Sequence, residues 1–220
     1  STWAKENLET QIEVSLKALW INDDNDIKKA KQVGDVTTID GDPTSYPADL
    51  YGKRLNIIDL VSRNGYRNVI EEFAYTWFNR FTALRFMEVN NYLPNKVRLF
   101  TNENNEFKPQ IIEEALHIEL DGLDRSRVFE LKEANNNEEL YKELLLATCN
   151  DMHKYLPGMF KTIDDYMTLL FPNNLLREES VLGRLISDID EDSWTDQVQI
   201  IGWLYQYYNT EPKDKVYARK

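Results

Sequence analysis

The longest regular pattern of apolar positions runs through residues 66–92. Apolar side chains recur there in steps of three and four, at Ile70, Phe73, Ala74, Trp77, Phe81 and Leu84. These steps place them on one face of an α-helix. More aromatic side chains lie off that face, which is typical of a helix buried inside a protein, and charged residues interrupt the stretch too often for a bilayer span. The pattern predicts a central buried helix at about 66–92, with Phe73, Trp77, Phe81 and Leu84 largely buried.

Helical spacing recurs on both sides of this central stretch. It predicts helices over 3–21, 53–63, 109–118, 124–134, 138–156, 164–170, 178–188 and 196–209. Gly65 follows the second of these and is expected to end it, because glycine readily takes the positive φ of a helix C-terminus. The chain is therefore expected to be mostly α, an irregular helical domain built around the central helix.

Two stretches lack helical spacing. Residues 22–51 are dense in Asp, Asn, Gly and Pro and are expected to form a loop or partly mobile connector. Residues 96–100 (KVRLF) alternate and predict a short strand or hairpin there. We therefore expect a helix plus polar connector over 1–51 and a main helical body over 52–220.

Composition and charge narrow the function. The chain has 220 residues with only 8 Gly and 7 Pro, which favours helices over turn-rich β folds. The single cysteine and the lack of a signal peptide or long apolar run favour a cytoplasmic protein without membrane contact. A net charge of −12 disfavours a phosphate-backbone partner. The region from 53 to 98 is basic, however, and within it we expect any nucleic-acid contact at Lys53, Arg54, Arg63 and Arg67.

Candidate chemical sites are weak. Cys149 and His153 are four residues apart on one predicted helix, but a buried structural cysteine beside a surface histidine is the favoured interpretation. The acidic run from Asp188 to Asp196 resembles the start of a calcium loop, yet it lacks the required glycine and closing glutamate; helix capping by Asp190 or Asp196 fits it better. The glycines are too dispersed to build a phosphate-binding loop. No catalytic, cofactor-binding or metal-ligating residue is predicted.

Four blocks of sequence resemble a known family. They are EEFAYTWFNRFTALRFMEVNNYLPNKVRLF (71–100), ELYKELLLATCNDMHKYLP (139–157), LLFPNNLL (169–176) and IIGWLYQYYNTEPKDKV (200–216). In this order they are similar to the N-terminal region of PglX, the adenine-specific DNA methyltransferase of BREX phage-defence systems. In that family this region precedes the catalytic domain, with its S-adenosylmethionine glycine motif and its Asn-Pro-Pro-Tyr tetrapeptide.

The resemblance implies a parent enzyme that transfers a methyl group from S-adenosylmethionine to N6 of adenine, on a base flipped from the duplex. For these 220 residues it implies a helical module that is inactive alone, binds no cofactor and supports the catalytic domain, DNA engagement or assembly with other BREX proteins. DNA would be met through the full-length enzyme. The alternative is a stand-alone interaction module with no link to catalysis.

Overall fold

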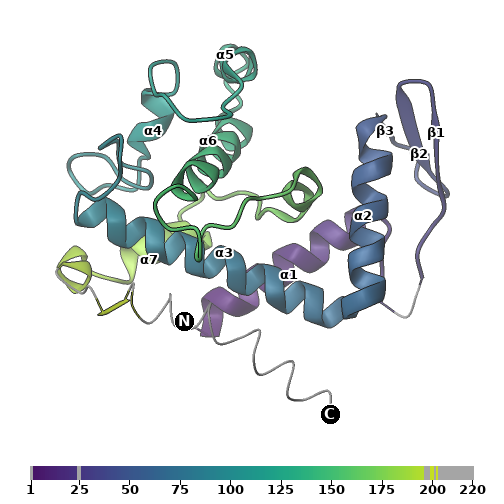
Figure 1. Ribbon diagram of the computed structural model, residues 1–220, viewed down its shortest axis with the longest axis horizontal. Coiled ribbons are helices and arrows are strands. Elements are labelled where there is room, and N and C mark those ends of the chain that lie inside the picture. Colours follow the sequence, from purple (N-terminus) through teal and green to yellow (C-terminus); the bar gives the residue numbers. More distant parts are fainter. Residues whose placement is uncertain (1, 24–25, 196–198, 201, 203–220) are drawn as a thin grey trace. The chain divides into compact units, whose positions relative to one another are not determined.

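The computed structural model of the chain describes residues 2–23, 26–195, 199–200 and 202. In chain order the elements, with η for a 3₁₀ helix, are α1 (Thr2–Ala18), β1 (Ala30–Val33), β2 (Val36–Ile39), β3 (Ser45–Pro47), α2 (Asp49–Asn64), α3 (Tyr66–Val89), α4 (Gln110–Glu113), α5 (Arg125–Glu133), α6 (Asn137–Met152), η1 (Asp165–Leu170), α7 (Val181–Ser187) and η2 (Glu191–Trp194) (Figure 1). The predicted mostly α class is confirmed. The helix predicted over 196–209 lies outside the described residues for most of its length.

Helix α3 is the predicted central helix. The four side chains expected in its core are buried, and Trp77 is only 1% exposed. Gly65 separates α3 from α2 as predicted: its φ is +89°, and its N–H donates to the carbonyl of Val61 at 2.8 Å. The positive φ explains why glycine stands at this junction.

The chain forms two compact units. Unit 1 comprises residues 1–78 and 164–172, and unit 2 comprises residues 79–163 and 173–220. The division falls within α3, so that one continuous helix supplies core residues to both units. A helix that serves two cores must be apolar over much of its surface, which accounts for the broad apolar pattern of residues 66–92.

Unit 1 contains the small sheet, and here the predicted loop over 22–51 is wrong. Strands β1, β2 and β3 pair antiparallel in that order beside α2 (Figure 1). A two-residue loop joins β1 to β2, and its first residue, Gly34, has the positive φ of +58° that a tight hairpin turn requires. Thr37 and Ile39 point inward and are buried, while Val36 and Thr38 are exposed. Exposed and buried residues do alternate along β2, but over only four residues, which is too short for the sequence pattern to reveal the strand.

The aromatic core of unit 1 is centred on Trp77. Its indole ring packs edge-on against Phe171, with ring centroids 4.8 Å apart. Its Nε1–H donates to the buried carbonyl of Leu170 at 3.2 Å. An edge-to-face pair with a satisfied indole N–H is the usual arrangement for a fully buried tryptophan. Residues 164–172 thus belong to the same core as α3, although they are distant in sequence.

Unit 2 is built around α6, which the sequence predicted over 138–156. Its N-terminus is capped by Asn136, whose side chain accepts from the N–H of Glu139. Helix α5 is capped by Asp124 in the same manner. Tyr141 on α6 is fully buried, and its hydroxyl donates to the carbonyl of Leu99 at 2.7 Å. The helix predicted over 109–118 is shorter than expected, because α4 ends at Glu113.

The strand predicted at 96–100 is absent, and this prediction is wrong. Lys96 lies in a turn with a φ of +60°. The N–H of Phe100 donates to the Glu88 carboxylate of α3 at 2.8 Å rather than to another strand. Residues 97–101 therefore run in irregular conformation against the helix, with Leu99 and Phe100 fully buried. Burial here does not alternate as it would in a strand, because Leu99, Phe100 and Thr101 are buried in succession.

Candidate functional site

Lys53 is a half-buried side chain of α2 that lies between two carboxylates. Its Nζ is 2.7 Å from Asp49 and 3.1 Å from Asp165. Partial burial lowers the pKa of Lys53, but the hydrogen bonds to the two carboxylates outweigh it and hold the pKa above its ordinary value. Two acidic neighbours offset this cation, so its field at a DNA phosphate is weak.

Arg54, the next residue, is buried with only 2% of its surface exposed. Its guanidinium donates to three carbonyls: Leu19 at 2.7 Å, Trp20 at 3.3 Å and Lys28 at 2.6 Å. Burial lowers its pKa from the usual value. These contacts hold the chain that leaves α1 and enters β1 against α2, which is a structural role.

Arg63 and Arg67 are the exposed members of the predicted set. Arg63 lies in the last turn of α2 and forms an ion pair with Asp59 at 2.7 Å, whereas Arg67 lies in the first turn of α3. Lys53 precedes Arg63 by ten residues on one helix, which separates them by about 15 Å along its axis. The structure brings Arg63 and Arg67 to the same helix junction, with Lys53 at a distance and Arg54 in the core. Their role in nucleic-acid contact stays a prediction.

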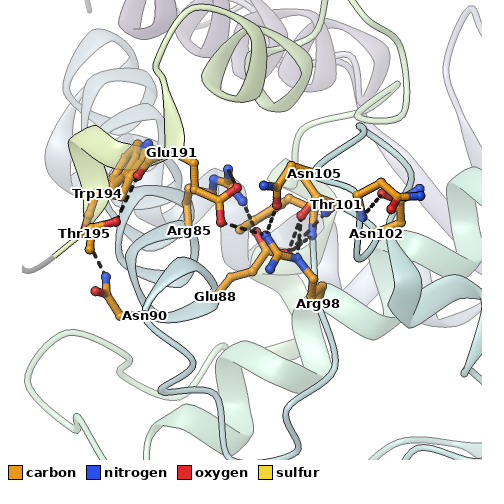
Figure 2. Close-up of polar contacts among 12 residues, drawn as sticks. Arg85, Glu88, Asn90, Arg98, Thr101, Asn102, Asn105, Glu191, Trp194 and Thr195 are labelled. Carbon is orange, nitrogen blue, oxygen red and sulfur yellow. Dashed lines mark hydrogen bonds and ion pairs between the residues drawn. The ribbon is translucent and has the colours of Figure 1, made fainter.

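A second group of charged side chains, in unit 2, was missed by the sequence analysis. Arg85 and Glu88 on α3 form a buried ion pair of 2.6 Å, and both side chains are almost completely enclosed. Figure 2 shows this pair at the centre of a network that reaches Arg98, Thr101 and Glu191. We call these five residues the arginine–glutamate network.

The network anchors irregular chain to α3. The carboxylate of Glu88 accepts from the N–H groups of Phe100 and Thr101, at 2.8 and 3.2 Å. Arg98 donates to the Thr101 hydroxyl at 2.8 Å and to Glu191 at 3.3 Å (Figure 2). Since Glu191 opens η2, the same network also holds that segment. Its carboxylates and guanidinium groups partner one another or the backbone, which gives the network a structural role.

Cys149 is fully buried on α6, as the structural interpretation predicted. Burial raises the pKa of its thiol to about 11, with a smaller opposing effect from Arg80. His153 is exposed, and its Nδ1 lies 2.8 Å from the carbonyl of Phe160. A thiol with such a high pKa is almost entirely protonated near neutral pH, which is unsuitable for a nucleophile. Its slow reaction with thiol reagents stays a prediction.

The acidic run near residue 190 does not bring carboxylates together as metal ligands among the residues that the structure describes. Asp188 pairs with Arg184 on α7 at 2.9 Å. Asp190 stands at the N-terminus of η2 but makes no side-chain cap, so the predicted capping by Asp190 is wrong; Asp196 lies outside the described residues. Among residues 2–23, 26–195, 199–200 and 202, no cluster of three or more His, Cys, Asp or Glu could hold a metal.

In the same ranges, no helix has the length and apolar character needed to cross a membrane.

Comparison with curated proteins identifies the relatives of this chain. It is 41% identical over 165 residues to the adenine-specific methyltransferase PglX of Lacticaseibacillus casei (strain Zhang), a match that covers 70% of the chain. It is 34% identical over 196 residues to the adenine-specific methyltransferase BrxX of Escherichia coli O9:H4 (strain HS), covering 88% of the chain. The predicted resemblance to the N-terminal region of PglX is confirmed. No protein-family model matches.

The similarity is confined to a small part of these relatives. The matched residues span 16% of the BrxX protein and 14% of the PglX protein. The relatives are therefore far longer than the 220 residues of this chain. The activity of PglX and BrxX as whole enzymes therefore cannot be assigned directly to a region of this size.

Proposed function

We propose that these 220 residues are a helical, non-catalytic module of a longer, BREX-type adenine-specific DNA methyltransferase. The observation that carries the proposal is the similarity to PglX and BrxX, at 34–41% identity, over most of this chain but only 14–16% of theirs. The parent enzyme transfers the methyl group of S-adenosylmethionine to N6 of adenine. The module supports the catalytic domain of the same polypeptide, its engagement of DNA or its assembly with other BREX proteins.

The buried polar side chains of the described residues favour a structural role for the module rather than a catalytic one. The buried charged side chains Arg54, Arg85 and Glu88 are each committed to anchoring the backbone or one another. The thiol of Cys149 is buried and protonated near neutral pH. A catalytic thiol needs access to its substrate and a pKa suited to its task, and the thiol of Cys149 has neither.

DNA contact by the module is proposed at Arg63 and Arg67, with Lys53 as a weaker contributor. Both arginines are exposed, and they lie at one helix junction. The net charge of −12 makes tight DNA binding by the module alone unfavourable. In the full-length enzyme the catalytic domain holds the duplex nearby, which raises the effective concentration of DNA at these side chains.

The proposal is tested with the full-length enzyme and with the module. We expect the full-length enzyme to methylate adenine and to lose this activity when residues 1–220 are deleted. We expect residues 1–220 alone to transfer no methyl group and to bind no S-adenosylmethionine by calorimetry. Cofactor binding by the module, or undiminished methylation without it, would contradict the supporting role. A gene that encodes no catalytic domain beside this region would favour a stand-alone interaction module.

The DNA contact has its own experiment. The double variant Arg63→Glu/Arg67→Glu of the full-length enzyme should bind DNA more weakly at every sequence. Its salt dependence should be less steep by about one unit for each DNA phosphate that these arginines no longer neutralise. Arg127→Glu on α5 is the matched control, because Arg127 is also exposed and paired with a nearby glutamate. Equal salt dependence in all three proteins would remove Arg63 and Arg67 from the interface.

A further inference from the structure

The sheet of unit 1 has one face covered by the protein and one face open to solvent. In an antiparallel sheet, residues directly opposite one another point to the same side. Thr37 and Ile39 of β2 point inward and are buried, and the Thr37 hydroxyl donates to the carbonyl of Ala48. The opposite side, here called the outer face, consists of Lys31, Val33, Val36, Thr38, Ser45 and Pro47, all of them exposed.

The outer face carries a continuous apolar row at the hairpin end of the sheet. Val33 is paired with Val36, which is paired in turn with Pro47. Val33 is 77% exposed, the largest value among the exposed large apolar side chains of the described residues, and Val36 is 41% exposed. Apolar side chains exposed singly are ordinary, but cross-strand neighbours have Cβ atoms only about 5 Å apart and form one patch.

The charge of the outer face indicates the class of partner. The row next to the apolar one is Lys31, Thr38 and Ser45, and the following pair is Lys29 and Asp40, joined by a backbone hydrogen bond of 2.9 Å. Two lysines beside an aspartate and an apolar row make a poor surface for a phosphate backbone, which needs clustered cations. An apolar centre with a polar rim is typical of a surface that contacts protein.

The small size of the patch indicates that its partner is tethered to the module rather than a separate protein. A stable interface between separate proteins buries about 800 Å² on each side, which is far more than a row of three small residues provides. A partner tethered in the same polypeptide needs much less contact area, because its effective concentration is high. The matched segment is only 14–16% of the length of the relatives. Most of each relative therefore lies outside this segment and could supply a tethered partner.

We propose that the outer face docks onto a protein surface of the same polypeptide, outside residues 1–220. This inference rests on the proposed function, because it requires a longer enzyme. Contact is made by side chains of the apolar row rather than by a strand added at β3, since Pro47 has no N–H to donate to a further strand. The hairpin of β1 and β2 thus acts as a docking element of the module.

Photo-crosslinking in the full-length enzyme tests this assignment. A benzoylphenylalanine is placed at Val33 and, as a matched control, at Val14, a valine of α1 that is 58% exposed. We expect the Val33 probe to crosslink to peptides beyond residue 220 of the same molecule, at a yield independent of protein concentration, and the Val14 probe not to do so. A yield that rises with concentration, indicating a second copy, would overturn the proposal. Crosslinks to DNA, or equal yields at both positions, would also overturn it.

A charge substitution gives a second measurement. Val33→Lys should speed limited proteolysis between this module and the rest of the enzyme, while Val14→Lys should leave the cleavage rate unchanged. Val33 is exposed at the end of a hairpin, so its substitution leaves the core of unit 1 intact. Both experiments report docking independently of methyl transfer. An enzyme that methylates adenine but shows no docking signal refutes this inference alone, whereas failure of the proposed function appears in the activity assay.

Discussion

Arg54 in unit 1 and Arg85 in unit 2 are both buried guanidinium groups, and the two units satisfy them by different means. Arg54 donates to three backbone carbonyls, of which the nearest, of Lys28, is 2.6 Å away. Arg85 faces the Glu88 carboxylate at 2.6 Å, and Glu88 accepts in turn from two backbone N–H groups. The first arrangement buries a cation among neutral dipoles, and the second buries a neutral pair.

The difference predicts how each unit responds when one group is removed. Deleting Arg54 removes the only charge of its cluster and leaves carbonyls that water can reach in part, since two of these hydrogen bonds are only partly buried. Deleting Glu88 leaves the cation of Arg85 buried with only the longer ion pair to Glu191, at 3.8 Å. A buried charge that loses its close partner is far more costly than an unsatisfied neutral group. The buried pair should therefore be the more sensitive of the two.

The largest effect is expected for Glu88→Ala. This substitution removes the close partner of the buried Arg85, and it also removes the acceptor for the N–H groups of Phe100 and Thr101. We expect the free energy of unfolding to fall by about 3–5 kcal/mol, measured by urea denaturation. In the double variant Arg85→Met/Glu88→Ala no charge is stranded, and the fall in its free energy of unfolding should be smaller than the sum for the two single variants. A fall of about 0–1 kcal/mol in the single variant, as for an exposed ion pair, would contradict the comparison.

Arg54→Met should have an intermediate effect. The methionine retains most of the apolar stem but cannot donate to the carbonyls of Leu19, Trp20 and Lys28. Unsatisfied buried acceptors predict a loss of about 1–3 kcal/mol in the free energy of unfolding, again from urea denaturation. Arg63→Met on the same helix is the control and should stay within about 1 kcal/mol, because the Arg63–Asp59 pair is exposed. A loss for Arg54→Met as large as that for Glu88→Ala would remove the distinction between the two arrangements.

The sequence contained a signal for Arg54 and for Glu88, the partner of Arg85. In α2 the buried positions Leu50, Arg54, Ile57 and Val61 follow steps of four, three and four, so Arg54 occupies an apolar position of the helix. In α3, Glu88 likewise continues the series that runs through Phe81 and Leu84. Charged residues are normally exposed, which is why Arg54 was assigned to a surface. A charge that interrupts an otherwise regular apolar face is better interpreted as buried and hydrogen-bonded.

Long helices were predictable and short β structure was not. The 24 residues of α3 and the 16 of α6 repeat their spacing over several turns, whereas β2 has four residues in which to show an alternation. The hairpin depends on the turn at Gly34 and on contact with α2, and periodicity reports neither. The alternation at 96–100 was also short and it misled, because this segment packs on α3 with Leu99, Phe100 and Thr101 buried in succession.

The smallest effect is expected at Asp42, which holds the same segment as Arg54 but from the surface. Its carboxylate accepts from the Thr44 N–H at 2.8 Å, from the Tyr46 hydroxyl at 2.7 Å and from the Trp20 indole N–H at 2.8 Å. These hydrogen bonds, that of Thr44 first, lower its pKa from 3.8 to about 2. Because the folded pKa lies below the unfolded one, the ionised carboxylate stabilises the fold above pH 3.8, and this stabilisation is lost as pH falls towards 2.

The test compares the chain with Asp42→Asn at several pH values. Near neutral pH the variant should be less stable, since an amide accepts these hydrogen bonds more weakly than a carboxylate does. Between about pH 4 and pH 2 the difference in free energy of unfolding should shrink towards zero, because the wild-type carboxylate becomes protonated there. Asp35→Asn, an exposed aspartate of the β1–β2 turn, is the control and should show no comparable trend. A difference that persists unchanged at pH 2 would mean that Asp42 acts through packing rather than charge. In unit 1, Arg54 would then be the charged group that anchors the segment between α1 and α2.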